Sequence, residues 1–544
     1  MAQTVAPPRF IAISSPKKIF LKISFNRVYR DSLKFCLYLR IIIKLRFYKL
    51  RIYFVLTMNT LLCYNKITIL QITILWSGFM FFGRERELAS LNNQYTSGKF
   101  EFPVVYGRRR VGKTQLIQEF IKDKRAIYVQ GVVGKERQNL NNFSSALYEF
   151  HHGEIGVGPS YNEIHDVLLE ITRIMKKEKI VLVIDEYPFL AESIPVISSM
   201  LQMYIDHHWK DLDTMLILCG SSMSFIEKQV LSYASPLYGR WITPYKLFEF
   251  TFNETRKFLG SMSDEDVLAY YAITNGIPFY LTMIDPKESL SENINRLFLE
   301  SNARLLEEPI NLLNMEVREP SSYMDVLTAI AAGASKTNEI ATKANLSQQL
   351  TKNILNNLIE LRVVEKITPT LATSRKPLYV IKDNLYRFWF TFIAKNVNFI
   401  RGAHSKKVES IIMERLSKFL APVFEHICRE WLLDVSETDG FDSYINEIGA
   451  WWGGNPKTKQ QEEIDIIATT LSDELFLGEC KWREKPVGVD VMQTLVARAE
   501  LFPEYENKKL FVFAKENFSD DAVVFAKENE IRLVAFKEMM DYYE

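Results

Sequence analysis

A glycine-rich stretch at residues 107–114 constrains the fold more than any other part of this chain. It reads GRRRVGKT and matches the pattern G-x-x-x-x-G-K-[ST] at every fixed position. A β-rich run, 102–106, precedes it and a helical pattern, 115–120, follows it, which is the context that such a loop requires. Its two glycines let the backbone curl so that N–H groups face phosphates, and the helix adds its positive N-terminal end. The pattern predicts a nucleotide-binding α/β domain.

The side chains of this loop have expected roles in binding ATP with Mg²⁺. Lys113 is expected to reach the β- and γ-phosphates and to act in catalysis, and the Thr114 hydroxyl is expected to ligate Mg²⁺. The three consecutive arginines add positive charge, although a second interpretation leaves their side chains simply solvated. The residues predicted to bind the nucleotide are Gly107, Arg108, Arg109, Arg110, Val111, Gly112, Lys113 and Thr114.

A second apolar strand ends in two acids 72 residues after Lys113. The run 180–184 is continuously apolar, which is typical of a strand covered on both faces of a parallel sheet. Asp185, which follows it, is predicted to bind the cofactor and to hold Mg²⁺, and Glu186 to act as the general base on the attacking water. Acids at strand ends are often merely solvated. The functional assignment of this pair therefore depends on the phosphate loop that precedes it.

Two further side chains are predicted to serve the same site. The strand 215–219 ends in small polar residues, of which Ser221 or its neighbour is predicted to sense the γ-phosphate. A pair of turn-forming serines is the equal alternative. Arg240 is predicted as a catalytic residue that stabilises transition-state charge, in cis or across a subunit interface, and an ordinary surface arginine is its alternative.

Charge divides the chain of 544 residues unevenly, although its overall net charge is only +1. Residues 1–79 carry seven Lys and six Arg against one acid, a net charge of +12, and the remainder carries −11. The apolar run 67–82 has 16 residues, fewer than the ~20 that span a bilayer. We interpret 1–79 as an upstream extension with Met80 as the functional start. A basic segment at a membrane surface is the alternative.

The five cysteines show no CxxC spacing. Neither a zinc site nor a disulfide framework is therefore predicted, and a reducing, cytoplasmic location is expected.

Downstream of Met80 the patterns predict four domains. Strands alternate with helices over 80–248, which predicts a P-loop NTPase core with a parallel sheet. Residues 249–310 are predicted to form a helical lid, with a break at 275–278. Residues 311–398 show three short helical patterns and then two β-like runs, which is the order of a winged helix. A last α/β domain is predicted over 399–544.

The chain resembles the prokaryotic ATPases often called the archaeal ATPase family, of the STAND-like branch of AAA+ proteins. That resemblance implies an AAA+-like core, a lid, a winged helix and a C-terminal restriction-endonuclease-like domain. Family members commonly start near the Phe-x-Gly-Arg-Glu box, which supports Met80 as the start. Asn275 departs from the Gly-Gly that relatives often show. The segments that carry the resemblance are 82–88, 106–114, 185–186, 236–240, 276–278, 386–390 and 479–482.

A β-hairpin predicted near the C-terminus groups two acids with a lysine. Residues i and i+2 of a strand share a face, so Asp465, Glu479 and Lys481 are predicted to lie together. The two acids are expected to ligate Mg²⁺, and Lys481 to position water or stabilise phosphate charge, all three as catalytic residues. This is the D…E-x-K pattern of PD-(D/E)XK nucleases, in which Glu425 matches an acid of the preceding helix. A degenerate domain that binds DNA or a partner without cutting is the alternative.

The predicted function is an ATP-hydrolysing switch whose ATP state regulates the C-terminal domain. A Mg²⁺-dependent DNA nuclease gated by ATP and a non-catalytic, nucleotide-gated DNA-binding scaffold are the alternatives. DNA, a second copy and a partner protein are the expected partners besides ATP, and a membrane is not expected. Asn353, Asn356 and Asn357 of the predicted recognition helix are the proposed DNA contacts, although such winged helices also serve as structural joints.

Overall fold

The computed structural model describes residues 81–371, 377–402, 404–438 and 444–543. Residues 80–544 form one compact unit. The interpretation of 1–79 as an extension and of Met80 as the start falls outside the described residues. In the described part of the chain, none of the helices combines the length and the apolar character that crossing a membrane requires.

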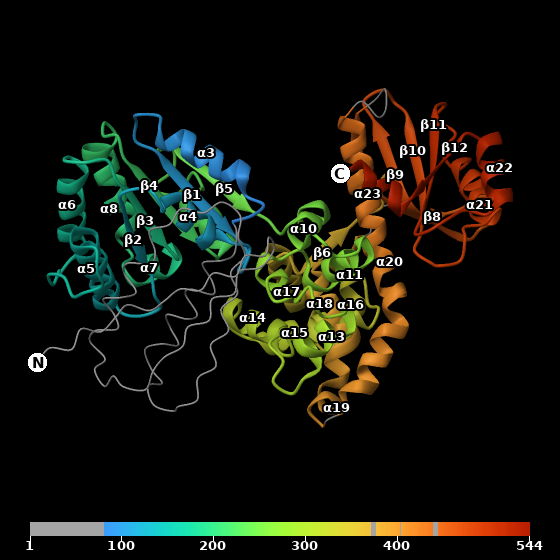
Figure 1. Cartoon of the computed structure of the whole chain (residues 1–544), viewed down its shortest axis with the longest axis horizontal. Helices are drawn as coiled ribbons and strands as arrows, with labels where there is room; N and C mark the ends of the chain where they lie inside the picture. Colours follow the sequence, from blue (N-terminus) through green and yellow to red (C-terminus); the bar gives the residue numbers. More distant parts are fainter. Residues whose placement is uncertain (1–80, 372–376, 403, 439–443, 544) are drawn as a thin grey trace, which may run out of the picture. The chain divides into compact units, whose positions relative to one another are not determined.

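A five-stranded parallel sheet follows the first described helix, with strand order β2-β3-β4-β1-β5 (Figure 1). The predicted parallel α/β sheet is therefore confirmed. Because β4 lies between β1 and β3, the segments that follow these three strands meet at one carboxyl edge, where such sheets bind ligands. The strands are β1 (Phe102–Gly107), β2 (Ala126–Gln130), β3 (Val181–Asp185), β4 (Met215–Gly220) and β5 (Ile242–Leu247).

Helices cover both faces of this sheet, which explains why its three central strands are buried along their whole length and are mostly apolar. One hydrophobic core packs against the first two helices and a separate core packs against the others. The helices are α3 (Glu85–Tyr95), α4 (Lys113–Ile121), α5 (Glu136–His152), α6 (Ile164–Met175), α7 (Tyr187–Ser193), α8 (Ile197–Tyr204), η1 (Ile205–Trp209), α9 (Met223–Phe225) and η2 (Ile226–Val230).

The next segment is helical, as predicted, and the break at 275–278 is present. Asn275 ends a helix with a φ of 58°, and Gly276 has a φ of 63°. A Cβ at Gly276 would lie 2.2 Å from the Phe250 carbonyl oxygen, so only glycine fits this turn. The helices are α10 (Phe252–Leu259), α11 (Asp264–Thr274), α12 (Pro278–Leu281), α13 (Leu290–Ile294), η3 (Asn295–Leu299) and α14 (Glu308–Glu316).

The predicted order of three helices and two strands is confirmed in the following segment. Ser347 caps the third helix, because its hydroxyl accepts a hydrogen bond of 3.2 Å from the Leu350 amide. The elements are α15 (Pro320–Ala331), α16 (Thr337–Ala344), α17 (Gln348–Glu360), β6 (Val364–Ile367), β7 (Leu378–Ile381), α18 (Asn384–Phe388), η4 (Trp389–Ile393), η5 (Ala394–Asn396) and α19 (Val397–Arg401).

The C-terminal part holds a mixed sheet of order β12-β11-β10-β9-β8, with helices on both faces. The strands β8, β9 and β10 pair antiparallel, as the predicted hairpin requires, and β10, β11 and β12 pair parallel. Helix α20 shares one core with α11, with the segment from α15 to β7 and with α18. The elements are α20 (Ser405–Glu437), β8 (Ile445–Gly454), β9 (Gln461–Thr470), β10 (Leu475–Lys481), α21 (Val489–Ala499), β11 (Lys508–Ala514), α22 (Asp520–Glu528), β12 (Ile531–Ala535) and α23 (Phe536–Tyr542).

Candidate functional site

The loop between β1 and α4 has the curled backbone that its glycines predict. Gly107 has a φ of 153°, and a Cβ there would lie 2.3 Å from the Leu247 carbonyl oxygen of the neighbouring strand. Gly112 has a φ of 93° and precedes the first residue of α4. Both positions therefore need glycine, one because of its backbone neighbour and one because of its left-handed conformation.

Lys113 points into this curl. Its ammonium donates hydrogen bonds to the carbonyl oxygens of Gly107 and Arg108, at 3.0 and 2.9 Å. The side chain is buried, and burial lowers the pKa of the ammonium even though nearby Cys219, Glu186 and Asp185 oppose the shift. An ammonium held by two neutral carbonyls is free to exchange them for anionic oxygens, which suits phosphate binding.

The two residues predicted to hold Mg²⁺ at this site lie side by side. The Thr114 hydroxyl donates to Asp185 Oδ2 at 3.0 Å, although 71 residues separate them in the sequence. The Tyr128 hydroxyl on β2 donates to the same oxygen, and the Glu186 amide donates to Asp185 Oδ1 at 2.8 Å. A hydroxyl and a carboxylate are oxygen ligands of the kind that Mg²⁺ prefers, so these residues fit the ion. Tyr128 was not predicted.

Glu186 is held beside the same edge. It has a φ of 48°, and its Oε2 accepts hydrogen bonds from the Ser221 hydroxyl at 2.9 Å and the Ser221 amide at 3.3 Å. A Cβ at Gly131 would lie 2.6 Å from the Glu186 carbonyl oxygen, so this glycine lets the two segments approach. Ser221 therefore contacts the predicted base, and its predicted role in sensing the γ-phosphate stays a prediction.

The three arginines of the loop each bind an acid from outside the parallel sheet and its helices. Arg108 binds Asp383, Arg109 binds Glu316 at 2.6 Å, and Arg110 binds Glu308 at 2.6 Å. The interpretation of these side chains as simply solvated is therefore wrong. Burial is the largest single influence and lowers the pKa of Arg108, but Asp383 together with Tyr386, Glu249 and Tyr280 raises it by more. The acids lie about 200 residues or more downstream, so no local pattern could identify them.

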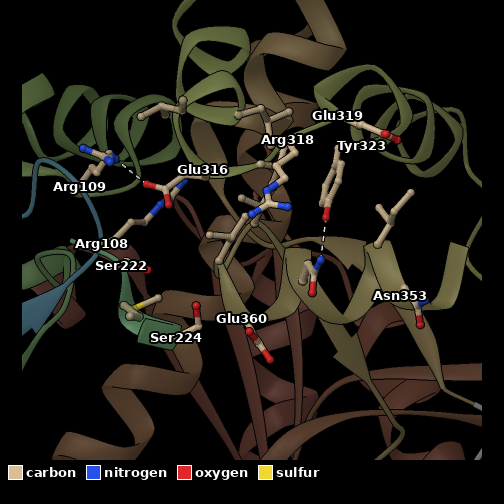
Figure 2. Close-up of a pocket in the computed structure, with 18 of the residues that line it drawn as sticks. Arg108, Arg109, Ser222, Ser224, Glu316, Arg318, Glu319, Tyr323, Asn353 and Glu360 are labelled. Carbon is tan, nitrogen blue, oxygen red and sulfur yellow. Dashed lines mark hydrogen bonds and ion pairs between the residues drawn. The ribbon is translucent and has the colours of Figure 1, made fainter. Parts of the chain in front are cut away.

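A cavity of about 600 Å³ lies beside this loop (Figure 2). Arg108 and Arg109 line it together with Ser221, and Figure 2 shows Arg109 directed to Glu316. Helix α17 contributes Asn353 and Asn357, and Asn357 donates a 2.7 Å hydrogen bond to the Tyr323 hydroxyl. Two of the three asparagines predicted to contact DNA thus face a cavity next to the phosphate loop.

Arg240 binds a carboxylate in this structure. Its Nε lies 3.1 and 3.2 Å from the two oxygens of Asp206, its Nη2 lies 3.1 Å from one of them, and its Nη1 donates to the Tyr238 carbonyl at 2.7 Å. Its predicted role in stabilising transition-state charge stays a prediction.

The predicted hairpin brings the C-terminal acids and lysine together. Lys481 Nζ lies 2.8 Å from Glu479 and 3.5 Å from Asp465, and the Cys480 amide donates to Asp465 at 2.8 Å. Burial raises the pKa of Glu479, and the negative charge of Asp465 adds to this shift. Burial opposes the charge of Lys481, but its two acidic neighbours raise its pKa. The shared face is therefore confirmed.

A second cation occupies this C-terminal acid site, defined as Asp465, Glu479 and Lys481. Arg498 of α21 donates to Glu479 and, at 3.0 Å, to Glu462. Arg498 was not predicted, because its helical spacing alone does not show that it reaches the sheet.

Glu425 of α20 interacts electrostatically with Asp465 and Lys481 of the acid site. Burial raises its pKa to about 7, and the charge of Asp465 adds to this shift. Over the described ranges, no cluster of three or more His, Cys, Asp or Glu side chains is arranged to hold a metal ion. Cys219, Cys428 and Cys480 are buried free thiols.

Comparisons with known proteins match both halves of the chain. A family model described as an ATPase domain predominantly from Archaea matches residues 81–284. A second, described as archaeal and bacterial proteins of unknown function, matches residues 389–493. The uncharacterized protein MJECL04 of Methanocaldococcus jannaschii is 31% identical over 409 residues, which cover 74% of this chain and 88% of that protein. The uncharacterized ATP-binding protein MJ0423 of the same organism is 44% identical over 46 residues, 8% of this chain and 78% of that protein.

Solved structures resemble the chain distantly. A STAND protein with a tetratricopeptide repeat sensor, PH0952 from Pyrococcus horikoshii, is 18% identical with a TM-score of 0.26, and the match covers 66% of this chain and half of that chain. Cdc6p from Pyrobaculum aerophilum is 13% identical with a TM-score of 0.28, and the match covers 58% of this chain and 94% of that chain.

Proposed function

The chain belongs to the archaeal ATPase family, and from that premise we propose that it binds ATP with Mg²⁺, hydrolyses ATP and regulates its C-terminal domain through the nucleotide state. The observation that supports this most is the hydrogen bond between Thr114 and Asp185 beside the buried Lys113. Two neighbouring residues of the loop and an acid 71 residues downstream of Thr114 would thereby form one site for a phosphate chain and its cation. An ATP-binding relative, MJ0423, agrees with this proposal.

The residues divide the chemistry among them. The loop amides and Lys113 would hold the phosphates, and Thr114 and Asp185 would hold Mg²⁺, which neutralises phosphate charge when bound. Glu186, oriented by Ser221, would accept a proton from the attacking water. Arg240 would stabilise charge on the phosphate, in cis or from a second copy, after release from Asp206.

The test is ATP hydrolysis by the full chain and its Lys113→Ala variant, followed as phosphate release. Loss of the ammonium should reduce hydrolysis to background. Lys122→Ala is the matched control, because Lys122 directly follows the last residue of α4 and its side chain is 72% exposed. Wild-type hydrolysis by Lys113→Ala would refute the assigned site. Nucleotide binding without turnover in the wild type would instead favour a nucleotide-gated scaffold, against which the intact Glu186 argues.

A second candidate function is Mg²⁺-dependent cleavage of DNA by the C-terminal domain. The contact of Lys481 with both Glu479 and Asp465 favours it. These two acids would ligate Mg²⁺, and Lys481 would position water or stabilise phosphate charge. Cleavage lost in Asp465→Ala but kept in Lys113→Ala and in the exposed control Glu504→Ala would support it. Unchanged cleavage by Asp465→Ala would contradict it.

A further inference from the structure

Helix α18 begins at the phosphate loop. Its N-cap residue Asp383 is fully buried, and its carboxylate accepts a 3.0 Å hydrogen bond from the Tyr386 amide while it binds Arg108 of the loop. The Asn384 amide, the first of α18, donates to the Asn275 side chain at 3.0 Å. One carboxylate therefore caps the helix and neutralises a phosphate-loop arginine at the same time.

The other end of α18 holds helix α20. Arg387 donates a 3.1 Å hydrogen bond to the Phe419 carbonyl, and its guanidinium lies 4.0 Å from the centre of the Phe419 ring. The rings of Phe388 and Phe392 pack against Phe419 with centroid distances of 5.6 and 5.4 Å. Three side chains from α18 and η4 thus pack against Phe419 of α20. Helices α18 and α20 are therefore closely packed together.

Helix α20 in turn forms a wall of the C-terminal acid site. Arg429 donates to the Asp465 carbonyl at 2.7 Å. The Phe424 ring lies 4.9 Å from that of Trp482, the residue after Lys481. A shift of α20 would therefore move both strands that carry the acid site.

We propose that α18 transmits the nucleotide state of the phosphate loop to the C-terminal acid site, with Asp383 positioning the helix against the loop and Arg387 positioning α20. This inference rests on the proposed nucleotide binding at the loop. It adds the physical connection through which that binding acts.

The ion pair between Arg108 and Asp383 allows two states of this connection, one with the pair formed and one with it broken. A triphosphate competes with Asp383 for the guanidinium of Arg108, and its negative charge repels the buried carboxylate. A buried carboxylate is costly without its cation, so loss of the pair favours an arrangement in which the start of α18 moves. Nucleotide then shifts the population because it binds the two states with different affinity. The shared core of α18, η4 and α20 passes the movement on.

The experiment measures hydrogen exchange of the full chain in peptides covering 417–431 and 463–482, with and without a non-hydrolysable ATP analogue and Mg²⁺. Asp383→Asn keeps an acceptor for the Tyr386 amide but removes the charge that binds Arg108. Arg387→Met tests the second contact, and its fold should persist because Arg387 Nη2 is buried without a hydrogen-bond partner among the residues that the structure describes. Glu316→Gln is the matched control, because it breaks the pair with Arg109 but lies on α14.

Without nucleotide, Asp383→Asn should raise exchange in 417–431 about threefold or more, and Glu316→Gln should leave it unchanged. The analogue should alter exchange in both peptides of the wild type and of Glu316→Gln, and in neither peptide of Arg387→Met. Unchanged exchange in nucleotide-free Asp383→Asn, or a full nucleotide response in Arg387→Met, would overturn the proposal. Equilibrium dialysis of the analogue with the wild type tests the proposed function separately, because the nucleotide-free comparison decides the coupling without it.

Discussion

The phosphate loop and the C-terminal acid site both place a lysine beside two acids, yet they balance charge in opposite ways. Lys113 donates to neutral carbonyls, and Asp185 accepts from hydroxyls and an amide. Glu479, in contrast, binds both Lys481 and Arg498. At the phosphate loop, the charges of Lys113 and Asp185 are therefore available to a ligand. At the C-terminal acid site, the charge of Glu479 is already neutralised by Lys481 and Arg498.

This difference teaches what a metal ion would meet at each place. At Asp185 the ion would replace hydrogen bonds from neutral groups, which is a modest exchange. At Glu479 it would compete with two cations, so it would bind only as those cations turn to other anions, such as the phosphates of a substrate. The predictions below test this contrast, from the largest expected effect to the smallest.

Removal of the general base should show that the first site is built for turnover. Glu186→Gln should lower ATP hydrolysis by about 10²- to 10⁴-fold while nucleotide binding persists, because the amide still accepts from Ser221 but takes no proton. Phosphate release and equilibrium dialysis measure the two quantities. Glu192→Gln, on the exposed side of α7, is the control. Equal losses in both variants would contradict the assignment.

Removal of one partner should show that the second site depends on its internal pairs. Glu479→Ala leaves Lys481 and Arg498 without their shared partner and should lower the free energy of unfolding by about 3 kcal/mol. Asp185→Asn should cost about 1 kcal/mol, because its partners are neutral. Urea denaturation of the two variants provides the comparison. A larger loss for Asp185→Asn would reverse the contrast.

The pH dependence of stability should show the cost of packing acids around the second site. Folding raises the pKa of Glu425 from its ordinary 4.5 to about 7, so the folded chain keeps a proton that the unfolded chain releases. This stabilises the folded state below about pH 4.5, and the contribution is lost as the pH rises through 7.

The wild type should therefore lose about 2 kcal/mol of stability between pH 5 and pH 8 that Glu425→Gln retains. Urea denaturation at several pH values measures this slope. Glu414→Gln, an exposed residue on the same helix α20, is the control. Parallel pH profiles for the wild type and Glu425→Gln would argue against a half-buried Glu425 that binds a proton near neutral pH.

An exposed pair should contribute least. Lys228 binds Glu360 at 3.2 Å with side chains 65% and 48% exposed, close to the same cavity as the loop arginines. Glu360→Gln should change the free energy of unfolding by less than about 0.5 kcal/mol, because water screens the pair. A loss as large as that of Glu479→Ala in the same urea series would show that charge pairing does not follow burial here.

Local patterns predicted the elements that carry strong signals. The phosphate loop, the apolar strands β3 and β4 and the hairpin of β9 and β10 all lie where the sequence places them. The strands β2 and β5 were not predicted, because they lie at the two edges of the sheet and mix buried residues with partly or fully exposed ones instead of forming continuous apolar runs. Tyr128 and Arg498 were missed for a similar reason, since neither belongs to a motif.

The residue order along the chain was sufficient for the curl of the loop, since the conformations of Gly107 and Gly112 follow from backbone geometry. It was also sufficient for the shared face of Asp465, Glu479 and Lys481, since strand alternation is a local property. Folding alone decided which acid meets each loop arginine and that α18 connects the loop to α20. Those pairs join residues up to 275 positions apart, and only the packing of the whole core selects such partners.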